Sequence, residues 1–137
     1  MRLVLDTNVV VSALVFGGTP LRLLQAAADG QALLFTSPVL LAELRDVLAR
    51  PHLAGPLAGK RSTVDQAIAT YGELALRVSP PSAPRAVERD PDDDHVIACA
   101  LAARADAIVS GDRDLLDLGQ YQGIAILTAA DALARLA

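Results

Sequence analysis

Four acidic residues stand at positions where their carboxylates could do chemistry together: Asp6, Glu43, Asp94 and Asp112. Asp6 directly follows a continuous apolar run at residues 3–5, and Asp112 follows another at 107–109 after one serine and one glycine. Short continuous apolar runs are typical of strands buried on both faces. Open parallel sheets bind ligands outside the carboxyl ends of their strands. We therefore expect Asp6 and Asp112 to meet at one sheet edge.

Glu43 and Asp94 depart from the amphipathic pattern of the helices expected around them. Glu43 lies four residues after Val39 and four before Val47, on the expected apolar face of a helix that follows the second strand. Asp94 shares the face of Ile97, Ala98 and Leu101 in the same way. A buried carboxylate is costly unless it is paired or binds a metal. Carboxylate oxygens are the ligands that hard cations prefer, so the four acids together predict a site for such a cation.

Each acid also has a purely structural interpretation. Asp6 could cap a turn, Glu43 could pair with Arg45, the acids at 92–94 could stabilise the first turn of a helix, and Asp112 and Asp114 could cap a short helix at 115–118. Four acids converging on one sheet edge, with no lysine nearby in the sequence, favour a hard cation over four independent caps.

The elements that would position these acids alternate along the chain. We expect strands at 3–5, 32–35, 75–78, 107–109 and 124–127, and helices at 9–15, 20–29, 38–50, 62–74, 91–105 and 130–136. Residues 51–60 and 79–84, which are rich in proline, are expected to be a loop and a connector. Strands separated by helices predict βαβ units and a parallel sheet covered on both faces, in a single domain spanning 1–137.

The composition fits a folded protein of the cytoplasm. Hydrophobic residues make up 53% of the 137 residues, no apolar run approaches the length of a membrane span, and no signal peptide is recognisable. The single cysteine excludes an internal disulfide and a cysteine-type zinc site. The net charge of −4 is unusual for a protein that binds nucleic acid, so the placement of the acids is more informative than their sum.

Four segments resemble the PIN domain family, most closely its bacterial toxin-type members. They are LDTNVVVSAL around Asp6, SPVLLAELRDVLAR around Glu43, DPDDDHVIACALAARADAIVSGDRDLL around Asp94 and Asp112, and GIAILTAADAL near the end. The resemblance covers nearly the whole chain in the order of the family's motifs. It implies a three-layer α/β/α sandwich with a central, mainly parallel five-stranded sheet. It also implies Mg²⁺- or Mn²⁺-dependent endoribonuclease activity, as in the toxin of a type II toxin–antitoxin pair.

By the same resemblance, Asp6, Glu43, Asp94 and Asp112 match the first to fourth acids of the family and would be both its catalytic residues and its metal ligands. Asn8 and Ser110 match supporting polar positions, and Asp114 could share the role of the fourth acid. The implied partners are an RNA substrate, a cognate antitoxin protein and a second copy of the chain in a homodimer, and no membrane.

Rival interpretations are weaker on specific residues. A phosphoacceptor receiver domain needs a lysine near the last strand, whereas the only lysine is Lys60. A phosphatase with an aspartate nucleophile needs a second acid two residues after Asp6, where Asn8 stands. A non-catalytic PIN module acting in RNA binding or as a scaffold remains the alternative from a different functional class.

Overall fold

The apolar runs of the sequence form a single sheet in a computed structural model that describes residues 1–80 and 91–136. Its strand order is β3-β2-β1-β4-β6-β5. All neighbouring strands are parallel except β5 and β6, which pair antiparallel. The strands are β1 (Arg2–Leu5), β2 (Leu33–Thr36), β3 (Ala75–Arg77), β4 (Ala107–Val109), β5 (Gln120–Tyr121) and β6 (Ile124–Leu127).

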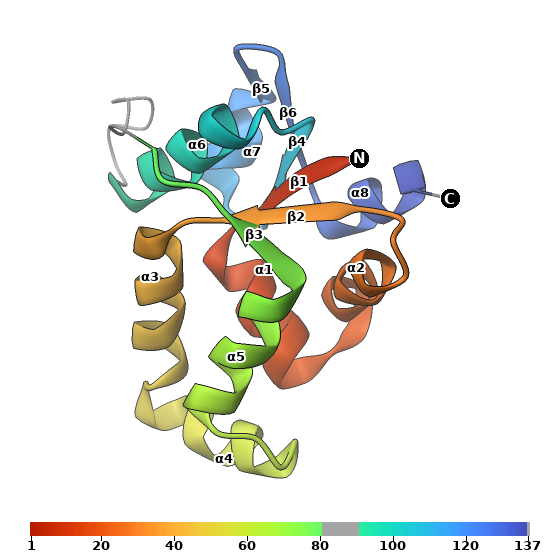
Figure 1. Cartoon of the computed structure of the whole chain (residues 1–137). Helices are drawn as coiled ribbons and strands as arrows, with labels where there is room; N and C mark the ends of the chain where they lie inside the picture. Colours follow the sequence, from red (N-terminus) through yellow and green to blue (C-terminus); the bar gives the residue numbers. More distant parts are fainter. Residues whose placement is uncertain (81–90, 137) are drawn as a thin grey trace.

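Helices cover both faces of this sheet. They are α1 (Thr7–Val11), the π-helical turn η1 (Ser12–Phe16), α2 (Gly18–Ala28), α3 (Pro38–Leu48), α4 (Pro51–Gly59), α5 (Val64–Leu74), α6 (Pro91–Ala103), α7 (Arg113–Leu118) and α8 (Ala129–Leu136). Helices α6 and α7 lie above the sheet in Figure 1, and α1, α2 and α5 lie below it. The predicted three-layer α/β/α sandwich is therefore confirmed.

Alternating side chains of the strands supply the two halves of the core. Leu3 and Leu5 pack with the helices below the sheet, whereas Val4 between them packs with α6 above it. Ile108 of β4 joins Val4 on the upper side. Because successive side chains of a strand point to opposite faces, each central strand must be apolar throughout, as the sequence predicted.

The prediction of a loop at residues 51–60 is wrong, because this segment forms helix α4. Its composition argues against a helix, since Pro56 lies inside it. Pro51, however, stands at the start of α4, where the missing amide hydrogen is not needed. Leu53 and Leu57, one helical turn apart, are each only 3% exposed. Tertiary burial of this pair outweighs the poor intrinsic propensity of the segment.

Two further elements differ from expectation. The helix expected at 9–15 is the short α1 followed by η1, and it ends at Gly17, whose φ of 85° is unfavourable for residues with a side chain. The sheet has six strands instead of five, because the chain turns back at Gly123 (φ 84°) and pairs Tyr121 with Ile124. Part of the expected connector, residues 81–84, lies outside the described residues.

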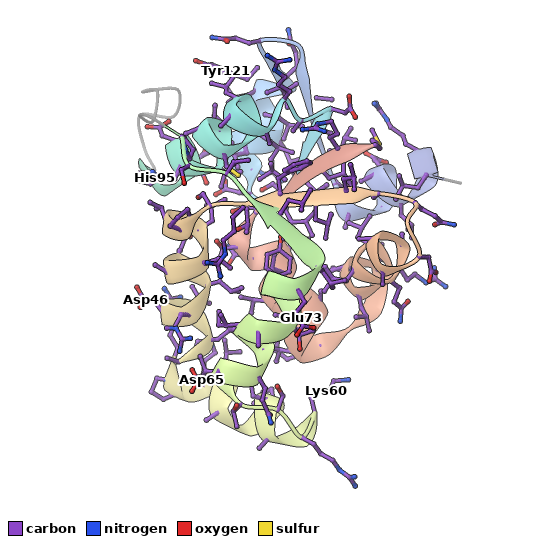
Figure 2. All side chains as sticks on the ribbon, viewed as in Figure 1. Asp46, Lys60, Asp65, Glu73, His95 and Tyr121 are labelled. Carbon is purple, nitrogen blue, oxygen red and sulfur yellow. The ribbon has the colours of Figure 1, made fainter. Side chains whose placement is uncertain are left out.

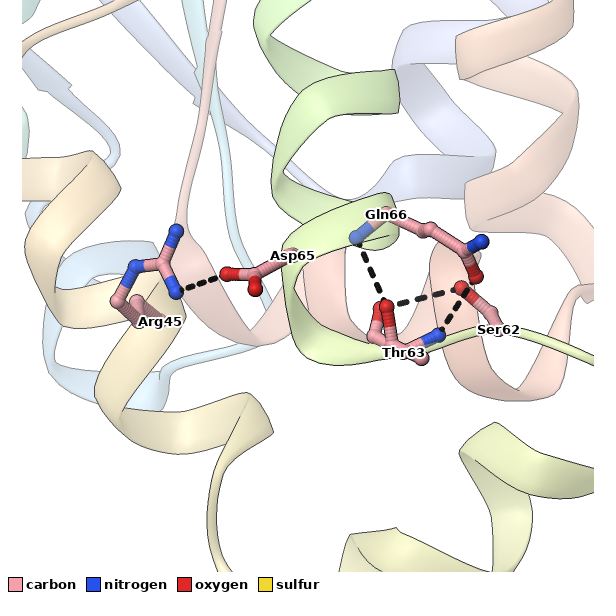
Figure 3. A network of polar contacts seen from close by, with 5 residues as sticks. All are labelled: Arg45, Ser62, Thr63, Asp65 and Gln66. Carbon is pink, nitrogen blue, oxygen red and sulfur yellow. Dashed lines mark hydrogen bonds and ion pairs between the residues drawn. The ribbon is translucent and has the colours of Figure 1, made fainter.

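Polar contacts on the solvent side of α3 and α5 include a helix cap and an ion pair (Figure 3). Thr63 caps α5, with its hydroxyl accepting from the Gln66 amide while the Gln66 side chain accepts from the Thr63 amide. Arg45 of α3 donates to Asp65 at 2.6 Å. Both partners are at least half exposed, so this ion pair contributes little to stability.

None of the described helices is both long and apolar enough to cross a membrane alone. The consecutive segments 7–16 and 18–28 reach that length only together, and they are bent by 96° at the break between them.

Tyr71 is a polar side chain buried in the apolar core below the sheet. It is 2% exposed, and its hydroxyl makes no hydrogen bond to any residue that the structure describes. Burial, and secondarily the nearby Cys99, raises the pKa of the Tyr71 phenol. Burial also raises the pKa of the Cys99 thiol to about 12, so this cysteine remains a neutral packing residue at physiological pH.

The first prediction follows from this isolated hydroxyl. Tyr71→Phe should stabilise the fold by about 1 kcal/mol, because a buried polar group without a partner carries a desolvation penalty. Thermal unfolding followed by circular dichroism measures the shift. Tyr71→Ala should instead destabilise by about 3–5 kcal/mol through the cavity it leaves. A lower melting temperature for Tyr71→Phe would show that the hydroxyl has a stabilising partner.

Candidate active site

Asp6 is the first residue after β1 and occupies the point where the strand order reverses. Strands β2 and β3 extend to one side of β1, and β4, β6 and β5 extend to the other. At such a switch point the connections leave on opposite faces and open a crevice. Asp6 is 5% exposed, and its backbone amide donates to the carbonyl of Val109 in β4 at 2.8 Å. The parallel register of β1 and β4 therefore places Asp6 next to Ser110.

Two hydrogen bonds hold the Asp6 carboxylate in place. Oδ1 accepts from the Thr7 amide at 2.8 Å, which makes Asp6 the N-cap of α1. Oδ2 accepts from the Ser110 hydroxyl at 2.7 Å. Hydrogen bonds to a charged acceptor are short and strong, and they orient the side chain. Asp6 is therefore the N-cap of α1, as the structural interpretation of this residue expected. Its carboxylate also faces the carboxyl end of the neighbouring strand β4.

Ser110 links Asp6 to the fourth predicted acid. Its oxygen accepts from the Asp112 amide at 2.9 Å, and Oδ1 of Asp112 accepts from the Asp114 amide at 2.8 Å. Asp112 is thereby the N-cap of α7, and Asp114 lies in the first turn of that helix. The cap interpretation holds for Asp112 as well. Capping uses only part of the acceptor capacity of a carboxylate, which has about four lone-pair sites.

The third member of the cluster comes from the N-terminal turn of α6. Oxygens of Asp6, Asp93 and Asp112 lie within 4.8 Å of one another. Asp93 is 3% exposed, because the residues three, four and seven positions later, Val96, Ile97 and Ala100, are all buried. Asp93 therefore lies on the inward stripe of α6.

Asp94 and Glu43 do not belong to this three-carboxylate group. Asp94 is also buried, at 2% exposed, as its place near Ile97 predicted. Glu43 is half-buried, and the face assigned to it from the sequence is partly wrong, because Val39 is 48% exposed. The inward side of α3 is instead formed by Leu40, Leu41, Leu44, Val47 and Leu48.

The group of Asp6, Asp93 and Asp112 fits a hard divalent cation. Ligands on opposite sides of Mg²⁺, each at about 2.1 Å, stand about 4.2 Å apart. Separations of up to 4.8 Å need only a small closure or one bridging water. Three carboxylates at this distance repel each other strongly at the low effective dielectric of a buried site. A bound cation attracts all three, so that the net electrostatic energy of the site becomes favourable.

Two pockets of different character flank the acids. One, of about 330 Å³, lies beside Asp112 and is lined by Asn8, Ser12, Ser110, Gly111 and Thr128 among others. The other, of about 350 Å³, is lined by Glu43, Asp46, Arg50 and His95 among others. Figure 2 shows His95 on α6 and Asp46 on α3 along the same side of the molecule. Glu43 thus opens onto an acidic pocket that does not include Asp112.

Sequence reasoning missed Asp93, Thr128 and His95. Asp93 and Asp94 both have apolar residues three and four positions later, so helical periodicity could not choose between them. Thr128 follows β6 as Ser110 follows β4, and register alone could have placed it at the same edge. His95, to which the sequence assigned no role, is half-buried and lines the pocket that contains Glu43.

Comparisons with known proteins agree with this geometry. No curated protein matches the chain by sequence. A chain in the crystal structure of VapBC2 from Rickettsia felis, bound to a DNA fragment from its promoter, superposes with a TM-score of 0.61. The match covers 93% of this chain and 98% of that chain at 14% identity, which shows a common fold and no more. The sequence profile of the PIN domain matches residues 2–114, which include all the acids described above. The chain therefore belongs to the PIN domain family.

Proposed function

We propose that this PIN domain is a divalent-metal-dependent endoribonuclease that hydrolyses RNA phosphodiesters and acts as the toxin of a type II toxin–antitoxin pair. The observation that carries the proposal is the convergence of Asp6, Asp93 and Asp112 within 4.8 Å at the switch point of the sheet. Isolated caps do not require such an approach of like charges, whereas a nuclease that binds a cation does.

The side chains around the cluster support this role. Asp6, Asp93 and Asp112 would hold Mg²⁺ or Mn²⁺, and Ser110 would keep Asp6 oriented through its 2.7 Å hydrogen bond. The bound cation would supply an activated water and neutralise charge on the reacting phosphate. Asp94 and Glu43, the third and second acids by resemblance, remain proposed members of the wider site, where a second cation could be held.

Hydrolysis in this site would form a bond between the water oxygen and phosphorus and break the bond from phosphorus to the 3′ oxygen. One water proton passes to the departing 3′ oxygen. The products are then a 5′-phosphate and a 3′-hydroxyl, as expected for this class of nuclease. Arginines at the rim, such as Arg50 beside Glu43, are suited to phosphate contacts because guanidinium forms paired hydrogen bonds with phosphate.

A partner that silences the enzyme is part of the proposal. The superposed VapBC2 chain comes from a complex bound to promoter DNA, and that context supports an antitoxin for the present chain. An apolar groove of about 270 Å³ between η1, α2 and α5 is available for a helix of such a partner. Leu14, Leu21, Leu24 and Leu74 line it. A partner arginine reaching the acids would compete with the cation.

The second prediction concerns the cation and the choice between two adjacent acids. Mn²⁺ at a hundredfold excess over its dissociation constant should add about 2.7 kcal/mol to the stability of the wild-type protein, because it binds the folded state alone. Asp93→Asn should lose most of this gain. Asp94→Asn is the matched comparison and should lose less of the gain, since it makes the same change one residue away at nearly equal burial and outside the three-carboxylate group. Calorimetry with and without Mn²⁺ measures both. The opposite order of the two variants would transfer the ligand role to Asp94.

The third prediction tests catalysis. Asp6→Asn and Asp112→Asn should each reduce cleavage of labelled single-stranded RNA by more than about 100-fold. Asparagine keeps an oxygen that can cap α1 or α7, so both variants should remain folded. Asp117→Asn, on the exposed side of α7, should cleave at the wild-type rate. Cleavage by the Asp6 variant, or absence of cleavage by the wild type with Mn²⁺, would favour the non-catalytic PIN module instead.

The fourth prediction concerns the partner. Expression of this chain alone should arrest bacterial growth, and expression of the adjacent short reading frame should restore it. Asp6→Asn should permit growth without the partner. Leu21→Glu, which places a charge in the apolar groove, should weaken rescue without lowering nuclease activity, because the groove lies apart from the acids. Unimpeded growth with active, soluble protein would contradict a toxin role.

A further inference from the structure

The pocket beside Asp112 has a lining that the acid cluster does not explain. One wall is formed by Asn8 and Ser12, at the same face of consecutive helical turns in α1 and η1. Gly111 and Asp112, which follow β4, and Thr128, which directly precedes α8, also line the pocket. Because Asp112 belongs both to this pocket and to the three-carboxylate group, a molecule in the pocket would adjoin a cation held there.

The lining offers neutral hydrogen-bonding groups that the fold leaves available. The side chains of Asn8 and Ser12 make no hydrogen bond to any described residue, and Ser12 is half-buried. The Thr128 oxygen accepts from the Asp131 amide, so its hydroxyl proton is still able to donate. The pocket of Glu43 and Asp46, by contrast, has two carboxylates in its wall. The pocket beside Asp112 contains a single carboxylate, which a bound cation would neutralise, so its hydroxyl and amide groups suit the hydroxyls of a ribose.

Two backbone features keep this pocket open. Ser12 begins the π-helical turn η1, and single π turns occur frequently at functional sites because they redirect side chains. A Cβ at Gly111 would meet no atom within 4 Å, and Gly111 does not adopt a positive φ. Glycine is therefore not needed there for the backbone, and the space next to Gly111, which lines the pocket, is open.

The volume of about 330 Å³ lies at the lower end of the range of about 300–1,000 Å³ for small-molecule pockets. It suits one nucleotide and excludes a folded duplex. Ribose differs from deoxyribose in its 2′-hydroxyl, which both donates and accepts hydrogen bonds. The Ser12 hydroxyl and the Asn8 amide can both donate and accept, so they can complement that group.

We propose that this pocket binds the ribonucleotide that adjoins the scissile phosphate of a single-stranded RNA, with Ser12 reading the ribose and Asn8 and Thr128 contacting the same nucleotide. The inference rests on the proposed nuclease function, which it extends to a substrate subsite. Ser12 is thereby a substrate-contacting residue that distinguishes RNA from DNA.

Binding and cleavage are tested separately. The four ribonucleoside 5′-monophosphates and their 2′-deoxy counterparts are titrated into the wild-type protein with Mg²⁺, and backbone amides are followed by NMR. We expect shifts at residues 8, 12, 111 and 128, and affinity for the deoxynucleotides about threefold to tenfold lower, as for the loss of one hydrogen bond. Ser12→Leu should abolish these shifts by filling the pocket. Gln31→Leu, which adds the same side chain at an exposed position before β2, should retain them.

Cleavage then tests the role of the Ser12 hydroxyl. A single 2′-deoxy nucleotide beside the cut should slow the wild type about threefold to tenfold. The same substitution should have little effect on Ser12→Ala, which has already lost the contact. A merely structural role of Ser12 would leave the discrimination intact and would overturn the proposal.

The outcomes separate this inference from the nuclease function. Shifts in this pocket without RNA cleavage would support the nucleotide subsite and count against a nuclease. RNA cleavage that Ser12→Leu leaves unchanged would overturn the subsite and leave the nuclease intact. Nucleotide shifts confined to the pocket of Glu43 and His95, or absent at millimolar nucleotide, would also overturn it.

Discussion

The structure depends on keeping one carboxylate, that of Asp6, buried at the carboxyl end of a central strand. An ionised carboxylate with 5% exposure is tolerable only when strong donors replace water. The Thr7 amide and the Ser110 hydroxyl supply them at 2.8 and 2.7 Å. The Thr7 donor follows from Asp6 capping α1, and the Ser110 donor follows from the parallel register of β1 and β4, which ends the two strands at the same level. The hydrogen-bonded pairing that builds the sheet thus also fixes the geometry of the acid site.

The same edge of the sheet concentrates charge that would weaken the fold if it were left alone. Asp93 arrives on α6 and Asp112 on the loop after β4, and their oxygens approach those of Asp6 within 4.8 Å. Local hydrogen bonds orient Asp6 and Asp112, and a bound cation would turn the repulsion among the three carboxylates into attraction. Sites that oppose local stability in this way are expected where function demands them. The apolar clusters on both sheet faces, from Leu3 below to Ile108 above, supply the stability that tolerates the site.

The surroundings of the acids differ from one side to the other. The pocket towards α1 and α8 contains one carboxylate, that of Asp112, and otherwise bears neutral hydroxyl and amide groups, such as Ser12 and Thr128. The pocket towards α3 carries Glu43 and Asp46 together with Arg50 and His95. A polyanionic strand that crosses the cluster would therefore meet neutral donors on one side and a mixture of charges on the other. The two sides of the crevice therefore differ chemically. A phosphodiester chain, whose two ends are not equivalent, would bind across it in one orientation.

The sequence by itself determined the layer architecture and the position of the edge at which the acids gather. Short continuous apolar runs such as residues 3–5, separated by longer helical segments, indicated strands covered on both faces, and Pro38 after Ser37 marks a helix start through local backbone geometry. Local rules failed where packing decided. Segment 51–59 is a helix because Leu53 and Leu57 are buried against the rest of the fold, despite an internal proline. Asp93 and Asp94 satisfy the same helical pattern, and only the docking angle of α6 on the sheet brought Asp93 to Asp6 and Asp112. Packing also decided that Glu43 of α3 lines a separate pocket. The rotation of a helix about its axis depends on the elements packed against it and not on its own sequence alone.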